Sequence, residues 1–321
     1  EDGLLVAIDI FHMRIFSKRS DNESILEEER DIGGWLLGEF DFKEKDQQLP
    51  SHIKGIAAGC LVPGQDDDLV EALCQRLQAA LQSYKIYALD YGKLVRFLFE
   101  KFTHTALTVL VDEDDGDGDV RRNIFRHLRD NQPCLLGNVD EEPLLDWANE
   151  KPAQRYKRLA EVMRPWSSSE NDDEAEHGKT LEWNPRALAL LKNAPDKAQV
   201  LRTFIASFRP SSWSGSYADL LASRIPLLDA IAADGDEELA KIAREAREKL
   251  ETDIAAYRKG EEEESRQEAR FSYAVRGAIT KTQNPQKDTK KHKNCKIKLF
   301  NKKTIRKKRQ FLVCLLCVLF F

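Results

Sequence analysis

The sequence contains none of the short motifs that mark common catalytic or cofactor sites. It has no Gly-x-x-x-x-Gly-Lys-Ser/Thr phosphate loop, no His-Glu-x-x-His pair and no Gly-x-Gly-x-x-Gly turn. Its longest apolar run, at 311–321, is well short of the roughly 20 residues that cross a bilayer as a helix. We therefore expect no cofactor and no structural metal in the protein, and no membrane span in residues 311–321.

Cysteine is scarce and irregularly spaced, with six residues in a chain of 321. The apolar stretch Leu4–Ile8 has no basic segment before it and no small-residue cleavage site after it, so it is not a signal peptide. Cys314 and Cys317 have the spacing of a metal pair, but their neighbours are apolar and no second ligand pair precedes them. We expect reduced thiols in a cytoplasmic protein.

The charge of the chain is divided unevenly. Residues 281–310 contain thirteen Lys or Arg and one acidic residue, Asp288, so this stretch carries +12 and residues 1–280 carry −17. The usage of residues changes near Phe271, and we expect 271–321 to be a disordered basic tail with an apolar end. Two interpretations stay open: an arm that binds anionic membrane or nucleic acid, or a tail without selected function, which the change in composition favours.

What the sequence does contain is a succession of helical patterns. Apolar residues recur every three or four positions in several segments, with capping residues at their starts. A kink or a break is expected at Gly33-Gly34. Ala106–Val111 is expected to complete the helix that Asp90 caps, with a short strand as the alternative. His12 is expected in the core with one backbone partner. The expected helices are 4–19, 23–42, 67–81, 90–111, 186–192 and those starting at Asp196, Ser216 and Asp236.

The helix starts at Asp196 and Asp236 are 40 residues apart, with two helices between them. This spacing resembles that of HEAT repeats, in which stacked helix pairs build an α-solenoid. The resemblance implies an all-α fold of stacked antiparallel helix pairs, a HEAT-like α-solenoid or an irregular helical array. Acidic loops near 112–119 and 167–178 divide the chain into segments 1–111, 112–178, 179–270 and 271–321.

One stretch partly matches a nucleophile elbow. Ser214 lies between small residues in Ser212-Trp-Ser-Gly-Ser216, but no strand precedes it and position 212 is not glycine. Ser216 and Asp219 instead have the spacing of a capping box, in which each side chain pairs with the other's backbone N–H. We interpret the stretch as a helix start, with Trp213 as a wedge against Arg209 or Arg224.

The acidic loop Asp112–Asp119 raises the possibility of a calcium site. An EF-hand alignment places Glu113, Asp115 and Asp117 at the first three ligand positions, but Ile124 falls where a bidentate Glu is required. The pattern fails at that residue, so a solvated loop is expected.

Aromatic side chains near expected helix ends are the remaining candidates for a site. An acidic helical protein can use exposed aromatics as anchors for a partner, although the same residues can also close the ends of helix pairs. The candidate partner-binding residues are Trp147, Tyr156, Trp166, Trp183 and Trp213.

The sequence thus predicts a non-catalytic helical scaffold that binds another protein or another domain of its own parent. The first residue is Glu1 and not Met, which suggests a piece of something longer. We expect the C-terminal part of a larger intracellular, bacterial protein. A basic partner would bind the acidic surface with an affinity that falls as salt rises. The alternatives are a hydrolase or metal-dependent enzyme with a site assembled from separate helices, and a protein tethered to membrane or nucleic acid by its tail.

Overall fold

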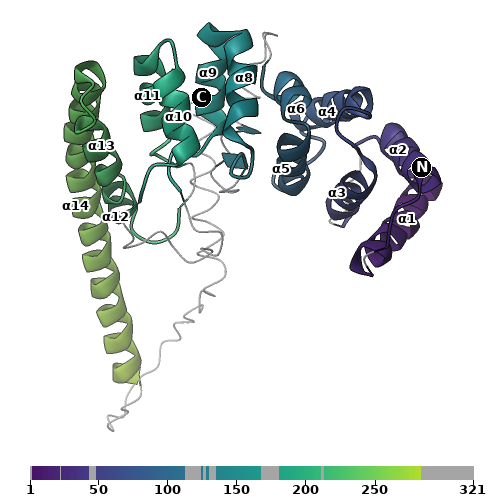
Figure 1. Cartoon of the computed structure of the whole chain (residues 1–321). Helices are drawn as coiled ribbons and strands as arrows, with labels where there is room; N and C mark the ends of the chain where they lie inside the picture. The colour runs from purple at the N-terminus through teal and green to yellow at the C-terminus, as the bar shows by residue number, and fades with distance from the viewer. Residues whose placement is uncertain are drawn as a thin grey trace. The chain divides into compact units, whose positions relative to one another are not determined.

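The computed structural model describes residues 2–21, 23–42, 48–112, 124–125, 128–129, 135–167, 181–210 and 213–282, with only the backbone described from 269 onward. The chain divides into two compact units, Glu1–Glu264 and Ser265–Phe321. Within the described residues the regular structure is helical, apart from one isolated antiparallel bridge between Trp166 and Trp183 (Figure 1). The all-α prediction is confirmed.

The helices follow one another with short connections. Their bounds are α1 Asp2–Ser20, α2 Glu27–Glu39, α3 Leu49–Cys60, α4 Asp67–Gln82, α5 Gly92–Lys101, α6 Thr103–Leu110, α8 Glu141–Glu150, α9 Pro152–Val162, α10 Pro185–Asn193, α11 Lys197–Ala206, α12 Tyr217–Ala222, α13 Ile225–Ala232 and α14 Glu237–Thr282.

The helices in the first part of the chain pack in a repeating order. Each helix contacts the helix two positions later: α1 with α3, α2 with α4, α3 with α5 and α4 with α6. The rule continues from α6 to α8, from α8 to α10 and from α9 to α11. Each helix therefore buries its apolar face mainly against close neighbours in the sequence, and the cluster of buried residues runs continuously from α1 to α14.

A kink or a break was expected at Gly33-Gly34, and the break is wrong because α2 is continuous there. The pair serves close packing instead. A Cβ atom on Gly33 would lie 2.4 Å from Sγ of Cys60 and 3.2 Å from a ring carbon of Phe11. Glycine is needed because α1 and α3 both approach the backbone of α2 at this point.

A buried carboxylate joins α1 to α2. The side chain of Glu29 accepts hydrogen bonds from Lys18 Nζ at 2.7 Å and Arg14 Nε at 2.7 Å, and from the backbone N–H of Leu26 at 2.9 Å. The bonds from Lys18, Leu26 and Arg14 lower the pKa of Glu29 to about 2. The ionised carboxylate therefore holds the first two helices together down to acidic pH.

Two other expected boundaries differ in detail. Ala106–Leu110 is helical and Val111 is the C-cap, but these residues belong to a new helix, α6, because Phe102 leaves helical geometry at φ −130° and ψ 47°. Phe102 is buried at this bend, so core packing accounts for the interruption. The residue that precedes α5 is Tyr91, and no side chain caps it, so Asp90 is not the expected N-cap.

Helix α14 continues past Phe271 to Thr282, so the first part of the expected tail is helical. The rest of the tail, including Cys295, Cys314 and Cys317, lies outside the described residues. Of the helices that are described, none has the length and apolar character needed to cross a lipid bilayer.

Alanine substitution at the two glycines of α2 tests the close packing. Gly33→Ala should lower the free energy of unfolding by about 1–3 kcal/mol, because the new methyl group overpacks Cys60 and Phe11. Gly34→Ala is the matched control: its Cβ would meet Leu69 at an ordinary 3.4 Å, so helix propensity should stabilise it by up to about 1 kcal/mol. Urea denaturation measures both, and equal stabilities of the two variants would contradict the packing.

Candidate functional site

Two of the predicted partner-binding aromatics, Trp147 and Tyr156, are buried between α6, α8 and α9. Nε1 of Trp147 donates to Oγ1 of Thr108 at 3.0 Å, and the Tyr156 hydroxyl donates to Oδ1 of Asn149 at 2.8 Å. Trp147 is fully buried and Tyr156 almost so. The expectation that these two rings are exposed is wrong.

Trp166 and Trp183 are also buried, and they bridge the chain around the acidic segment that precedes α10. The guanidinium carbon of Arg224 lies 3.8 Å from the ring centroid of Trp166, a cation–π contact inside the core. Nε1 of Trp183 donates to the carbonyl of Leu227 at 2.8 Å. Both rings therefore hold α13 against the segments before α10, and their expected exposure is wrong as well.

Trp213 alone among the five candidates is exposed, at 53%. Its ring lies 4.3 Å from that of Tyr217, centroid to centroid. The expected cation partners are engaged elsewhere: Arg224 stacks on Trp166, and Arg209 pairs with Asp253 of α14. Trp213 is therefore the one predicted anchor that is accessible to a partner.

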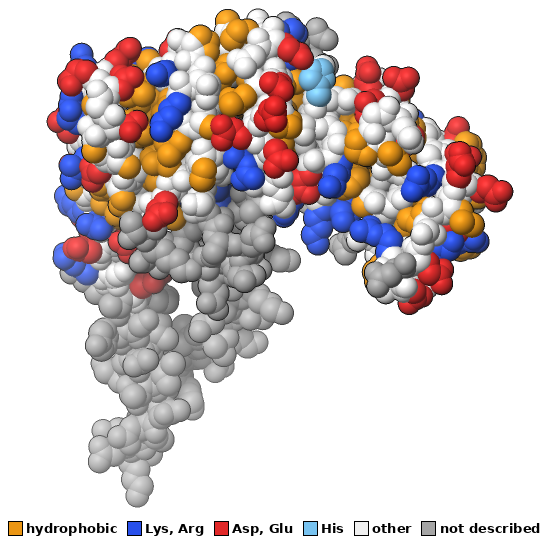
Figure 2. Space-filling model, in the orientation of Figure 1, with side chains coloured by type: hydrophobic (Ala, Val, Ile, Leu, Met, Phe, Trp, Pro, Cys, Tyr) orange, Lys and Arg blue, Asp and Glu red, His pale blue; other side chains and the backbone are white. Residues whose placement is uncertain are grey.

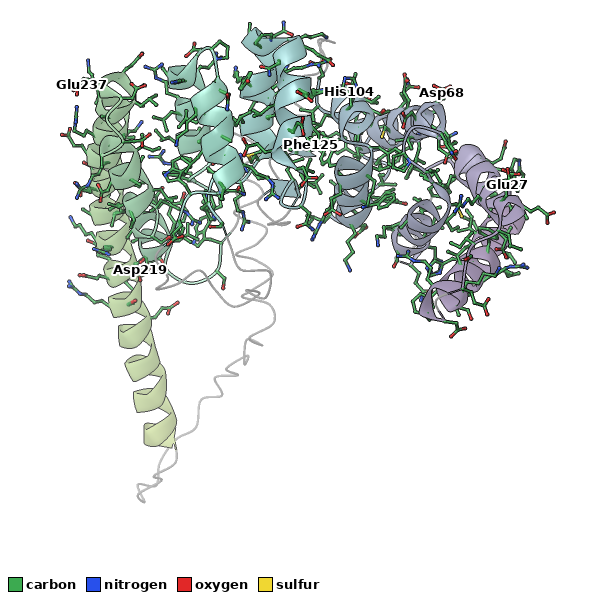
Figure 3. All side chains as sticks on the ribbon, in the orientation of Figure 1. Glu27, Asp68, His104, Phe125, Asp219 and Glu237 are labelled. Carbon is green, nitrogen blue, oxygen red and sulfur yellow. The ribbon has the colours of Figure 1, made fainter. Side chains whose placement is uncertain are left out.

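A buried arginine organises the charged residues near Trp147. Arg155 pairs with Asp112 at 2.6 Å and with Glu150, and it donates to the carbonyl of Trp147 at 2.8 Å. Burial acts to lower the pKa of Arg155, but its bonds to Asp112 and Glu150 outweigh this effect and raise it. His104, labelled in Figure 3, binds the same Glu150 at 2.7 Å. Each of these charged side chains has a partner of opposite charge, which is typical of a structural network.

No nucleophile is assembled among the described residues. Ser214 lies in an exposed bend, and the geometry gives it no histidine or carboxylate partner there. Cys60 and Cys74 are free and buried, and burial raises the pKa of each thiol to about 12. Thiols with such a pKa remain protonated and are poor nucleophiles.

The described residues hold no group of three or more His, Cys, Asp or Glu side chains that is arranged to bind a metal. Glu113, Asp115 and Asp117 of the calcium hypothesis lie outside the described residues. Ile124 is described, and it packs against the core as a partly buried side chain.

The start of α12 is capped from another helix. Oγ of Ser216 accepts from the N–H of Asp219 at 3.1 Å, as the capping-box spacing predicts. The reciprocal bond is different: Glu261 of α14 accepts from the Ser216 hydroxyl at 2.7 Å and from the N–H of Tyr217 at 2.8 Å. Asp219, labelled in Figure 3, contacts Arg258 instead.

This arrangement predicts which carboxylate matters for stability. Glu261→Ala should lower the free energy of unfolding by about 1 kcal/mol, because it removes the acceptor for the first N–H groups of α12. Asp219→Ala is the control and should cost less than half as much. Chemical denaturation followed by circular dichroism measures both. A larger loss in the Asp219 variant would favour the local capping box over the contact with α14.

Hydrophobic side chains are exposed on α1 and α2. The sequence pattern did not predict this exposure. Val6, Ile10 and Met13 follow one another at spacings of four and three, so they share one face of α1. The opposite face carries the buried Ile8 and Ile15. We call the exposed set the α1–α2 apolar surface, and it consists of Val6, Ile10, Met13, Phe16, Leu26, Ile32 and Trp35.

Each side chain of this set is at least 48% exposed. Ile10 is 67% exposed and Trp35 is 59% exposed, although α1 and α2 contact each other. In Figure 2, hydrophobic side chains lie among charged ones at the end of the view where Figure 1 shows these helices. Single exposed apolar side chains are normal on a folded protein, whereas a contiguous set of them marks an interaction surface.

A groove of about 450 Å³ lies beside this surface, between α1 and α3. Its lining includes Phe16, Arg19, Lys54 and His12. His12 stacks on His52 at 4.3 Å, and within the described residues its buried Nδ1 has no hydrogen-bond partner, so the expected backbone partner is not found there. Burial, and next the proximity of His52, lower the pKa of His12.

The lowered pKa of His12 makes stability depend on pH. Because the unfolded chain binds the proton more tightly, the contribution of His12 to stability is fully present above its ordinary pKa of 6.5 and is lost as the pH falls below that value. His12→Gln should reduce this slope, and urea denaturation at a series of pH values measures it. The contribution of Glu29 to stability falls in a different pH range, because it is lost only as the pH falls below about 4.5 toward 2. An unchanged slope in the variant would rule out His12 as the source.

Comparison with known proteins adds no relative: no protein-family model, no curated protein and no solved structure matches the chain.

Proposed function

We propose that the unit Glu1–Glu264 is a non-catalytic scaffold of HEAT-like helix pairs that binds a protein partner through the α1–α2 apolar surface. The observation that carries the proposal is the exposure of Val6, Ile10, Met13 and Trp35 on helices that are otherwise well packed. Apolar area on a folded surface costs solubility, and burying it against a partner recovers free energy at about 25 cal/mol per Å².

The packing of the helices supports the HEAT-like part of the proposal. In a solenoid each repeat contacts only its neighbours, and the contacts of α1 with α3 and of α2 with α4 follow this pattern. The same row of contacts leads from α6 through α8 to α10. Such stacks present long continuous surfaces, which suits binding of other proteins or of further domains of the same parent.

The proposal includes a cytoplasmic location. Cys60 and Cys74 are buried free thiols, and neither is placed to form a disulfide in the described part of the chain. Reduced, inert cysteines are typical of proteins that work in a reducing compartment.

The apolar surface also changes the expected chemistry of the partner. An acidic surface would bind a basic partner with strong salt dependence, whereas apolar contacts are little affected by ionic strength. We therefore expect a partner that offers an amphipathic helix or another apolar face to α1 and α2. Its affinity should change little with added salt.

Site-specific photo-crosslinking in cells tests the surface. p-Benzoylphenylalanine at Trp35 should give a discrete adduct with one partner, because this exposed ring lies within the proposed contact. The matched control is the same residue at Tyr84, another exposed aromatic, which lies after α4 and is not a member of the surface. The partner is then purified and recombined with the full chain, and the same adduct should form.

The recombined pair gives the quantitative test. Ile10→Glu should weaken binding about 30-fold, since a central apolar contact is worth about 2 kcal/mol. Isothermal titration calorimetry measures the affinity, and the free energy of unfolding should stay unchanged because Ile10 is exposed. Equal adducts at Trp35 and Tyr84, or full affinity in the Ile10 variant, would contradict the proposed surface.

A further inference from the structure

The groove between α1 and α3 has a mainly apolar lining, and Phe16 belongs both to this lining and to the α1–α2 apolar surface. The side chain of Ile15 is 1% exposed, and the ring of Phe16 lies 6.3 Å from that of His12, centroid to centroid. On the α3 side, Gly55 adds no side chain to the lining. The groove therefore offers a small ligand an apolar surface that can be reached from solvent.

Two cationic side chains line the same groove, Arg19 of α1 and Lys54 of α3. Neither has an ion-pair or hydrogen-bond partner among the residues that the structure describes. The other two cations of α1 are engaged, because Arg14 and Lys18 both pair with Glu29. Arg19 and Lys54 are therefore available to an anion.

No acidic residue lines the groove in the described part of the chain. Helix α3 contains neither Asp nor Glu, and the acidic residues of α1 are Asp2 and Asp9. Asp9 binds Nδ1 of His52 at 2.7 Å, and it precedes Arg19 by ten residues, which is about 15 Å along the helix axis. Charges farther apart than about 8 Å are largely screened at physiological salt. Lys54 follows His52 by two positions, so the two side chains lie on different sides of α3.

The carboxylate of Asp21, which follows α1, is also outside the lining. It accepts from the hydroxyl of Ser17 at 3.4 Å. Ser17 precedes Arg19 by two positions and lies on a different side of α1, so this bond holds Asp21 away from the face that Arg19 occupies. The groove therefore keeps the positive charge of its two cations.

We infer that this groove binds a small amphiphilic carboxylate, which is a molecule with one carboxylate group and an apolar chain. Arg19 and Lys54 supply charged donors for the carboxylate oxygens, and Ile15 and Phe16 cover the chain. An uncharged chain would leave the cations without a partner, and a fully polar anion would leave the apolar lining in contact with water. The groove thus selects for a ligand that has both parts.

Octanoate is the probe, and 1-octanol and acetate are its controls, because each control lacks either the charge or the chain. Equilibrium dialysis of the radiolabelled compounds against the full chain measures binding at about pH 8, where octanoate is ionised. Octanoate should bind saturably at one site. Both controls should bind at least fivefold more weakly. Non-saturable uptake, or equal binding of octanol, would show simple adsorption to apolar surface and would overturn the inference.

Paired substitutions locate the site. Arg19→Gln and Lys54→Gln should each weaken octanoate binding at least threefold, and the double variant at least tenfold, because each removes a charged donor. Octanol binding should not change in these variants. The matched controls are Arg30→Gln and Lys192→Gln, exposed residues of α2 and α10 that are outside the lining. They change the net charge equally, so they should keep the wild-type affinity within about twofold.

The inference does not rest on the proposed scaffold function, and one variant separates the two. Ile10→Glu, which should weaken the protein partner, should keep octanoate binding within about twofold, because Ile10 does not line the groove. The melting temperature of the Arg19 variant without ligand should equal that of wild type, since Arg19 is exposed. The inference is also overturned if the double variant binds octanoate like wild type or if the matched controls lose as much affinity.

Discussion

The close approach of α1, α2 and α3 is the contact on which the start of the helical stack depends. Gly33 lets both neighbours reach the backbone of α2, and Gly55 and Gly59 of α3 similarly accept His12 and Ile15 of α1. At the same junction, the ionised Glu29 of α2 accepts hydrogen bonds from Arg14 and Lys18 of α1. Each helix is covered mainly by the next two along the chain. The way α1, α2 and α3 pack at this junction therefore determines which faces of α1 and α2 stay exposed.

The middle of the chain is held together by cations and aromatic rings. Arg155 lies over Trp147 at 4.4 Å and pairs with Asp112, while Arg224 lies over Trp166. Burying an arginine is costly unless its charge is compensated, and the rings and carboxylates supply that compensation. Side chains that are used in this way inside the stack cannot also anchor a partner. The exposed apolar side chains on α1 and α2 are not used in this way.

The fold class could be predicted from the sequence because helical periodicity and capping are local. Asp196 caps α11 at an expected helix start with a bond of 2.7 Å to the backbone, and Asn184 caps α10 with a bond of 2.9 Å. The candidate site could not, because burial depends on contacts distant in sequence. Trp147 meets Thr108, and Trp183 meets Leu227, so both rings near helix ends turn inward. Gly33 was misjudged for the same reason: its neighbour Cys60 lies on another helix. The exposed stripe of α1 had a local signal, since apolar residues occur on both sides of that helix.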